Sequence, residues 1–210
     1  TDDGFIYRAT ADGLQIMDAR DPRELRVFGR LDLLCRQVEV NEGIAYVGGW
    51  NGLDVVDVSN PHHPQVLAHI DVGGVRSLAM GEGYLYVHAS HYSEHRLVIL
   101  DIRNASDPEI VGSQGWGESS GAMTYADGYL YHLTGERYWQ AGGYGMPRGA
   151  RLQVFDVGNP LAPAEVSSLQ WEPVRSFPQG LAISGKTAYV SIQKCRQVRN
   201  DPRDPMRYKH

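Results

Sequence analysis

Three histidines lie close together in the segment HASHYSEH, at His88, His91 and His95, and a fourth, His132, begins the segment HLTGERYWQAGG. Imidazole nitrogens are the usual protein ligands of zinc and copper, so His88, His91 and His132 are candidate ligands of such a transition metal. The spacing matches no closed metal motif, and no carboxylate or cysteine partner is obvious nearby. Histidines in a loop, exposed to solvent or hydrogen-bonded, are the alternative interpretation.

Four aspartates end similar apolar phrases, GLQIMD, GLDVVD, RLVILD and RLQVFD, at Asp18, Asp57, Asp101 and Asp156. As carboxylates they could bind a metal or act as acids and bases. Each one, however, ends a β-rich run and precedes a polar turn that contains proline. A short carboxylate in that place accepts hydrogen bonds from backbone N–H groups of the turn. We therefore expect these aspartates to anchor turns.

Nucleophilic catalysis has weaker support in the sequence. Ser119 and Ser120 follow Glu118 in GESSG, which is not the G-x-S-x-G elbow between a strand and a helix. The chain has no P-loop, no dinucleotide-binding fingerprint and no haem-attachment motif. Catalytic residues therefore remain unassigned. Its two cysteines, Cys35 and Cys195, either pair across distant repeats or are two unrelated thiols.

The aspartate phrases recur at intervals of about 40 to 55 residues, which is the period of a repeat architecture. Between them lie VEVNEGIAYVGG, LAMGEGYLYVHA, MTYADGYLYHLT and LAISGKTAYVSI, each an alternating strand, a tight turn with glycine and a second strand. A tyrosine recurs in the second strand, and we expect it to pack between neighbouring sheets. The tyrosines are Tyr7, Tyr46, Tyr86, Tyr131 and Tyr189.

The aspartate phrase adds a third strand to this hairpin, and a fourth follows the proline turn. Four antiparallel strands cannot bury both faces alone, but copies stacked face to face can, as the blades of a β-propeller do. The phrases DVVDV, LVILD and LQVFDV, with Asn-Pro or Asp-Pro beyond them, resemble the LVIVD repeat of bacterial and archaeal β-propeller proteins. The resemblance extends from Phe5 to about Ile192. It implies a propeller, but little about activity, because propellers include enzymes, binders and scaffolds.

The predicted fold class is therefore all-β, a β-propeller of four-stranded antiparallel blades with about four to five blades represented. Residues 1–193 form the repeats, and residues 194–210 form an irregular basic tail. The first blade lacks its innermost strand and the last stops after its second. We expect an incomplete ring, a fragment whose remainder is absent, disordered or on another chain; a small closed ring with an unusual seam is the alternative.

Departures from the repeat indicate where a site would lie. With the strands of a blade lettered A to D outward from the axis, the B–C and D–A connections open on one face. We expect variable B–C loops after His88 and after His132, and D–A connections whose Arg36, Arg76 and Gln179 occupy one equivalent position and surround the channel mouth. The expected ligand-binding residues are Arg36, Arg76, Glu118, Arg137, Tyr138, Trp139 and Gln179.

Two functions fit this pattern. The first is a binding module for a protein partner, the remaining propeller segment, a glycan or a small ligand, acting through the face with the variable loops. The alternative is a metal-dependent hydrolase, lyase or oxidoreductase with zinc or copper at the channel mouth. The formal charge of −5 argues against a nucleic-acid partner, and no apolar run is long enough for a membrane span. The resemblance implies an extracellular or periplasmic location.

Overall fold

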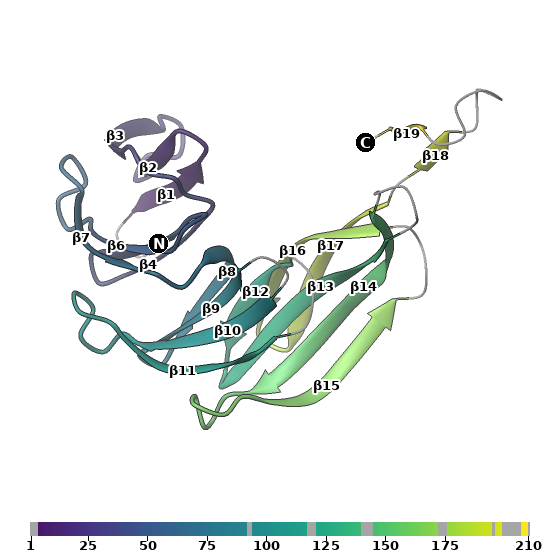
Figure 1. Cartoon of the computed structure of the whole chain (residues 1–210). Coiled ribbons are helices and arrows are strands. Elements are labelled where there is room, and N and C mark those ends of the chain that lie inside the picture. Colours follow the sequence, from purple (N-terminus) through teal and green to yellow (C-terminus); the bar gives the residue numbers. More distant parts are fainter. Residues whose placement is uncertain are drawn as a thin grey trace. The chain divides into compact units, whose positions relative to one another are not determined.

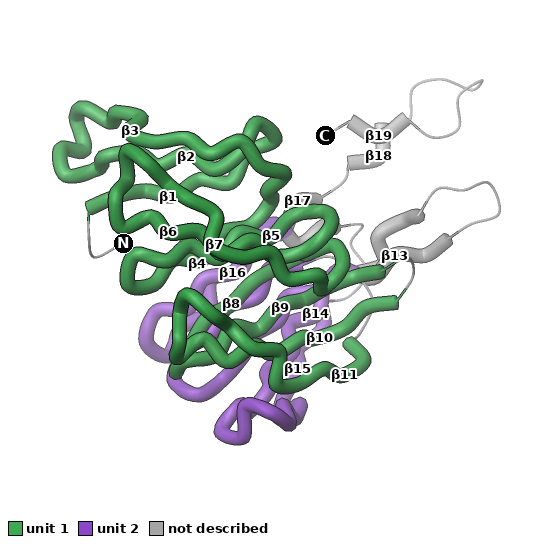
Figure 2. Tube along the Cα trace, turned by 60° about the vertical axis from the view of Figure 1, so that its left-hand side comes forward, with its two compact units in different colours: residues 1–117 green, residues 118–210 purple. Residues whose placement is uncertain are grey.

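The computed structural model describes residues 4–91, 94–116, 121–139, 145–171, 176–194, 196–198 and 207–209. In this part of the chain the regular elements are all β-strands (Figure 1). The chain divides into two compact units, Thr1–Gly117 and Glu118–His210 (Figure 2). Among the described residues, no helix is long and apolar enough to cross a membrane.

The first unit contains one three-stranded and two four-stranded antiparallel sheets, with the orders β1-β2-β3, β4-β5-β6-β7 and β8-β9-β10-β11. Each sheet follows the chain without a crossover, as the strands of a propeller blade do. The strands are β1 Phe5–Thr10, β2 Gly13–Asp18, β3 Arg26–Leu31, β4 Gln37–Asn41, β5 Ile44–Gly48, β6 Leu53–Asp57, β7 Gln65–Ile70, β8 Gly74–Gly81, β9 Tyr84–His91, β10 Glu94–Asp101 and β11 Glu109–Gly115.

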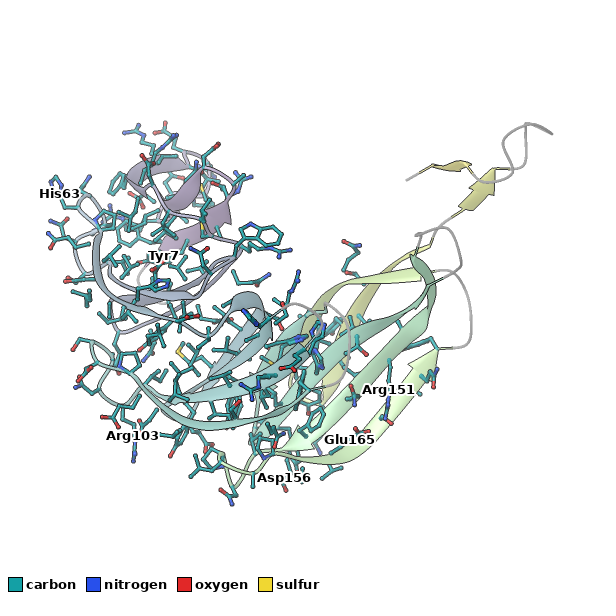
Figure 3. The ribbon with its side chains drawn as sticks, viewed as in Figure 1. Tyr7, His63, Arg103, Arg151, Asp156 and Glu165 are labelled. Carbon is teal, nitrogen blue, oxygen red and sulfur yellow. The ribbon has the colours of Figure 1, made fainter. Side chains whose placement is uncertain are left out.

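The second unit contains a four-stranded sheet with the order β12-β13-β14-β15 and the two-stranded sheets β16-β17 and β18-β19. The predicted four-stranded antiparallel blades are thus confirmed in both units. Between the last two strands of the four-stranded sheet, Arg151 donates to Glu165 at 2.6 Å (Figure 3). The strands are β12 Met123–Ala126, β13 Tyr129–Trp139, β14 Gly145–Asp156, β15 Ala164–Trp171, β16 Ser176–Ser184, β17 Thr187–Lys194, β18 Arg196–Val198 and β19 Arg207–Lys209.

Tight turns join the first two strands of the four-stranded sheets, as the sequence predicts. In the β4–β5 turn, Glu42 has a φ of 49° and Gly43 a φ of 77°. The β8–β9 and β12–β13 turns also have two successive residues with positive φ. Two such residues form the mirror-image turn whose twist matches that of a hairpin.

All four repeat aspartates accept a hydrogen bond from the backbone N–H two residues further on. The N–O distances are 3.0 Å at Asp18, 2.9 Å at Asp57, 3.0 Å at Asp101 and 2.8 Å at Asp156. The residue after each aspartate donates to the carbonyl of the glycine directly before the strand that pairs with the aspartate phrase, as Val58 does to Gly43 at 2.8 Å. The predicted turn-anchor role is confirmed.

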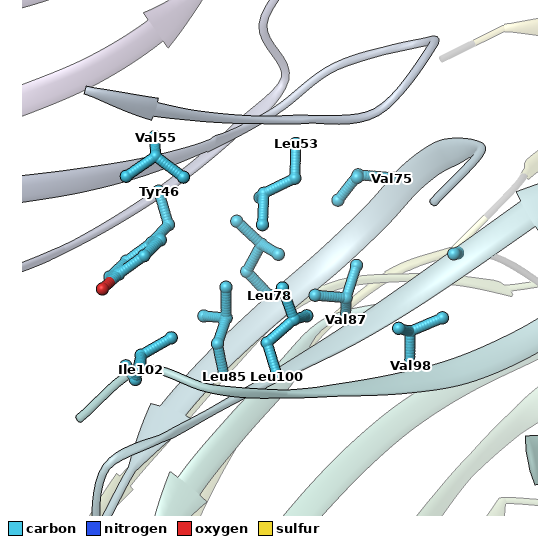
Figure 4. Packing of buried hydrophobic residues seen from close by; sticks show 11 residues of the cluster. Tyr46, Leu53, Val55, Val75, Leu78, Leu85, Val87, Val98, Leu100 and Ile102 are labelled. Carbon is cyan, nitrogen blue, oxygen red and sulfur yellow. The ribbon is translucent and has the colours of Figure 1, made fainter. Parts of the chain in front are cut away.

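The core of the first unit lies between its sheets. Tyr46, Leu53 and Val55 pack against side chains of the β8–β11 sheet, among them Leu78 and Leu85 (Figure 4). The opposite face of the β4–β7 sheet contributes a second apolar cluster, which it shares with the β1–β3 sheet. The two sides of the central sheet are therefore both buried, as stacked blades require.

The prediction for the repeat tyrosines is only partly confirmed. Tyr46 and Tyr86 are buried, and the Tyr46 hydroxyl donates to the Ala105 carbonyl at 3.1 Å. Tyr189 is 61% exposed, so the packing prediction is wrong at this position. In the two-stranded β16–β17 sheet, its cross-strand neighbour is only the small side chain of Ala182.

Candidate functional site

A glycine-rich turn between β5 and β6 presents an exposed tryptophan, Trp50, whose side chain is 59% exposed. The turn is closed by a hydrogen bond from the Gly49 N–H to the Gly52 carbonyl at 2.9 Å. It is also tied to the next sheet, because the Val75 N–H donates to the Gly49 carbonyl at 2.8 Å. The backbone below this indole is therefore fixed on two sides.

Two glycines of this turn are required by the backbone. A Cβ added at Gly49 would lie 2.2 Å from the Leu34 carbonyl oxygen. Gly52 has a φ of 147°, and a Cβ there would lie 2.6 Å from the Ile70 carbonyl oxygen. Real Cβ atoms do not approach backbone oxygens so closely, so the turn depends on residues without a side chain.

Two predicted binding residues meet at this indole. The guanidinium carbon of Arg36 lies 4.2 Å from the Trp50 ring centroid, and that of Arg76 lies 6.0 Å from it. Both distances are within reach of a cation–π interaction. The Nε of Arg76 also donates to the Ser90 hydroxyl at 2.8 Å, which orients its guanidinium. We refer to Arg36, Trp50 and Arg76 as the Trp50 site.

Below the turn, His69 of β7 pairs with Asp54 of β6, with 2.7 Å between His69 Nδ1 and Asp54 Oδ1. This hydrogen bond raises the pKa of His69, and a backbone hydrogen bond at Asn51 adds to the effect. Asn51 directly follows Trp50 in the turn. The His69 ring thus links the outer strands of the sheet to the turn that carries the tryptophan.

Sequence reasoning identified Arg36 and Arg76 but missed Trp50. The sequence feature that could have indicated Trp50 is a large aromatic residue within GGWNG, where the surrounding glycines leave the side chain no local packing partner. The partnership itself depends on two neighbouring sheets, because Arg36 precedes β4 and Arg76 belongs to β8. No local pattern contains that contact.

Arg36, Arg76 and Gln179 do occupy one register position. In each sheet, the residue after the repeat tyrosine pairs with a residue of strand A. These pairs are Val47 with Val38, Val87 with Leu78, and Val190 with Leu181. Arg36, Arg76 and Gln179 each lie two residues before that strand-A residue. The expectation that all three precede strand A is wrong for Arg76 and Gln179. They lie inside β8 and β16 at register shifts, where the ladder skips one residue. A common ring of the three around a channel stays a prediction.

The histidine segment also differs from the expected loop. His91 is the last residue of β9 and His95 the second of β10, because the β9–β10 ladder continues as far as the pair Glu94 and His91. His88 is fully buried in β9, and its Nε2 lies 3.0 Å from Nδ1 of His95. Ser77 is buried opposite His88 on β8. The segment builds a buried polar patch on one sheet.

A metal site in this segment gains no support from the geometry. Among the residues that the structure describes, no three His, Cys, Asp or Glu side chains gather as they would around a metal ion. His88 and His91 belong to the first unit, whereas His132 is buried in β13 of the second. The zinc or copper hypothesis for His88, His91 and His132 therefore stays a prediction. Cys35 is a buried thiol that donates to the Thr10 carbonyl at 3.3 Å, and Cys195 lies outside the described residues.

The segment after His132 was expected to be a binding loop, and most of it is a hairpin instead. β13 and β14 pair continuously from Tyr129 and Asp156 out to Trp139 and Gly145, with one register shift after Glu136. Arg137, Tyr138 and Trp139 are thus strand residues, although their side chains lie outside the described part of the structure. Glu118 lies outside it altogether.

In the three four-stranded sheets the B–C hairpin lengthens along the chain while its base stays the same. The first residue of strand B pairs with the repeat aspartate in each case: Ile44 with Asp57, Tyr84 with Asp101, and Tyr129 with Asp156. Strand B has 5 residues in β5, 8 in β9 and 11 in β13. All added length therefore projects from the end of the sheet opposite the aspartate.

At the same end of the β8–β11 sheet lies a hollow of about 360 Å³ within the first unit. Its polar lining includes His91 and Glu94 from the hairpin end, Arg96 from β10, and Asp71 from the preceding connection. Both signs of charge line it.

Comparison with solved structures defines the class of protein as a β-propeller. A protein from Lactobacillus plantarum is 14% identical with a TM-score of 0.58, over 93% of this chain and 62% of that one. A chain of the S. cerevisiae Dbp5 complex with Nup159 and Gle1 is 13% identical with a TM-score of 0.54, over 90% and 55%. A chain of the nidogen/laminin complex is 15% identical with a TM-score of 0.51, over 79% and 58%. This chain thus spans little more than half the length of the last two.

Within that class, the family model of the LVIVD repeat matches twice, over residues 35–71 and 72–114. These segments coincide with the β4–β7 and β8–β11 sheets and the connections before them. Residues 35–114 therefore carry two LVIVD repeats in a β-propeller fold; the resemblance from Phe5 to about Ile192 is confirmed over this part. No curated protein matches the chain.

Proposed function

We propose that this propeller chain is a binding module that acts through the end of its blades where strands B and C meet. The observation that carries the proposal is the β13–β14 hairpin, which extends by 6 residue pairs beyond the pair Leu133 and Leu152 to reach Trp139 and Gly145. In the β4–β7 sheet the same hairpin ends at Gly48 and Leu53. Loops and projecting arms on a rigid scaffold commonly carry binding residues.

Two further observations support a binding role. The Trp50 site lies at the B–C end of its own sheet and leaves a large aromatic side chain exposed. Tryptophan and arginine are the residues most enriched where binding energy concentrates. Two of the structurally similar chains come from protein complexes, one with Dbp5 and Gle1 and one of nidogen with laminin. A protein partner is therefore the class we propose for the hairpin.

The proposed location is outside the cytoplasm, in the periplasm or the extracellular space, on the basis of the LVIVD repeats. Fractionation of the source cells with an antibody against the full chain tests it. The protein is expected in the extracytoplasmic fraction, and recovery with cytoplasmic markers would contradict the proposal.

A shortened hairpin tests the binding role. Residues 136–149 are replaced by Asn-Gly, because Gly135 and Ala150 form a cross-strand pair that a two-residue turn can close. Peptides are first selected by display on the full wild-type chain and then measured by calorimetry. We expect the shortened variant to bind them at least tenfold more weakly, with an unchanged urea midpoint.

The matched control is His63→Ala, at the exposed C–D turn of the opposite end. It is expected to bind the selected peptides as the wild type does. Selection that yields no peptide, or peptides that bind the shortened variant equally well, would refute the proposed use of this end.

A further inference from the structure

We propose that the Trp50 site binds the carboxylate of an acidic sugar, with the sugar ring lying against the exposed indole. The inference rests on the proposed function, since it assigns a ligand class to one site on the binding end. It concerns the β4–β7 and β8–β11 sheets only, whereas the peptide-binding test concerns the β13–β14 hairpin.

The first argument is the state of Arg36. Its guanidinium is exposed, and the guanidinium carbon lies 4.2 Å from the centroid of the Trp50 ring, within the range of a cation–π contact. In the part of the chain that the structure describes, no carboxylate forms an ion pair with it. The planar fork of donors matches a carboxylate in two-point geometry.

The second argument is the charge around the indole. Arg76 places a second guanidinium carbon 6.0 Å from the same ring, and its bond to Ser90 fixes its direction. Asp54, the carboxylate of the neighbouring strand, is already engaged by His69 at 2.7 Å. Two guanidinium groups therefore lie within reach of one aromatic ring.

The third argument is the exposed indole itself. Trp50 is 59% exposed on a turn that is held by its glycines, by one hydrogen bond within the turn and by one to the next sheet. A fixed aromatic surface loses little conformational entropy when a ligand covers it. The C–H face of a pyranose is apolar and flat enough to cover such a surface, and a carboxylate on that ring then lies within reach of a guanidinium. A uronate joins both features in one small molecule.

The test is titration of the full chain with D-glucuronate, followed by calorimetry and tryptophan fluorescence. We expect saturable binding that Arg36→Gln weakens about tenfold or more and that Trp50→Leu weakens similarly. Arg36→Lys, which keeps the charge but loses the planar fork, is expected to weaken it too. Arg30→Gln removes one exposed positive charge from β3 and serves as the matched control, with unchanged affinity.

Comparison ligands define the ligand class. D-glucose should bind at least tenfold more weakly than glucuronate, and so should acetate, because each supplies only one of the two features. A uronate trimer that binds more tightly than the free acid would identify a polysaccharide as the source. Equal affinity would identify the free sugar acid.

Several outcomes would overturn the inference. They are no binding of glucuronate, equal binding of acetate and glucuronate, or equal weakening by Arg30→Gln and Arg36→Gln. If glucuronate fails to bind while the selected peptides still require the β13–β14 hairpin, this inference falls and the proposed function stands. If the peptide test fails while glucuronate binds through Arg36 and Trp50, the proposed use of the hairpin falls instead.

Discussion

Replacing Tyr46 by phenylalanine isolates one hydrogen bond that joins two neighbouring sheets. Tyr46 lies on β5 and is fully buried, and its hydroxyl donates across to the Ala105 carbonyl, in the turn after β10, at 3.1 Å. The phenylalanine ring fills the same space, so no cavity forms. What is lost is the hydrogen bond alone.

The size of the effect follows from the surroundings of the acceptor. A neutral hydrogen bond contributes about 0.5–1.5 kcal/mol to the free energy of unfolding, and more where the abandoned partner stays buried. Ala105 is only half-buried, so water can replace the lost donor. We therefore expect Tyr46→Phe to lower the free energy of unfolding by about 1 kcal/mol. Tyr46→Ala also removes the ring from the core, and the expected cost is about 3–5 kcal/mol.

The effect also depends on pH in a defined direction. Burial, with a smaller contribution from Glu42, raises the pKa of Tyr46 to about 12. The native state favours the neutral phenol, so this contribution to stability is fully present below about pH 10, where the unfolded tyrosine is also neutral. It is lost as the pH rises from there through 12. The difference between wild type and Tyr46→Phe should therefore be smaller at pH 11 than at pH 8.

Urea denaturation of the full chain at both pH values measures this, with the free energy taken from the midpoint at constant slope. Tyr189→Phe is the matched control, because its side chain is 61% exposed, and it should change stability by less than about 0.5 kcal/mol. If the two substitutions cost the same at pH 8, the hydroxyl of Tyr46 does not stabilise the sheet pair. If the cost of Tyr46→Phe is the same at pH 11, the linkage is refuted.

Three further predictions follow from the turns and the Trp50 site. Gly49→Ala should lower the free energy of unfolding by about 1–3 kcal/mol in urea denaturation, because its Cβ would lie 2.2 Å from a backbone oxygen, whereas Gly115→Ala, with open space around it, should cost nothing measurable. Side-chain and backbone hydrogen bonds from Arg103 lower the pKa of Asp101 to about 2. The contribution of Asp101 to stability is therefore present above about pH 4 and is lost as the pH falls through 2. Over that range, the urea midpoint of Asp101→Asn should fall less than that of the wild type. Asp54→Asn should lower the pKa of His69 towards its ordinary value in an NMR titration, because Asp54 stabilises the charged ring. The contribution of this pair to stability is present below about pH 6.5 and is lost as the pH rises through the raised pKa. An unchanged titration would contradict the pairing.

The features that the sequence predicted correctly are those with local causes. A turn such as Glu42-Gly43 needs only its own two residues to adopt positive φ, and Asp57 needs only the N–H of Ser59. Both interactions recur in every repeat where the same residues recur, so the sequence alone predicts them. The all-β class and the four-stranded blades follow from the same repetition.

The errors concern contacts between sheets and the ends of strands. The sequence predicts a loop after His88 that contains His91 and His95, yet pairing with β10 keeps His91 in a strand. Arg76 was placed before strand A because one skipped residue in the ladder leaves no trace in a single sequence. The contact of Arg76 with Trp50 joins β8 to the turn after β5 in the neighbouring sheet. Cross-sheet geometry of this kind is set by packing and not by local preference.

The fixed base of the B–C hairpin makes its tip a natural place for grafting new segments. Because strand B always begins opposite the repeat aspartate, residues inserted at the tip leave the turn anchors and the intersheet core untouched. Insertions that add the same number of residues to both arms keep the alternation of side chains between the two faces. A designer could therefore extend the B–C hairpin that is already the longest, β13–β14, and obtain a new recognition arm on an unchanged scaffold.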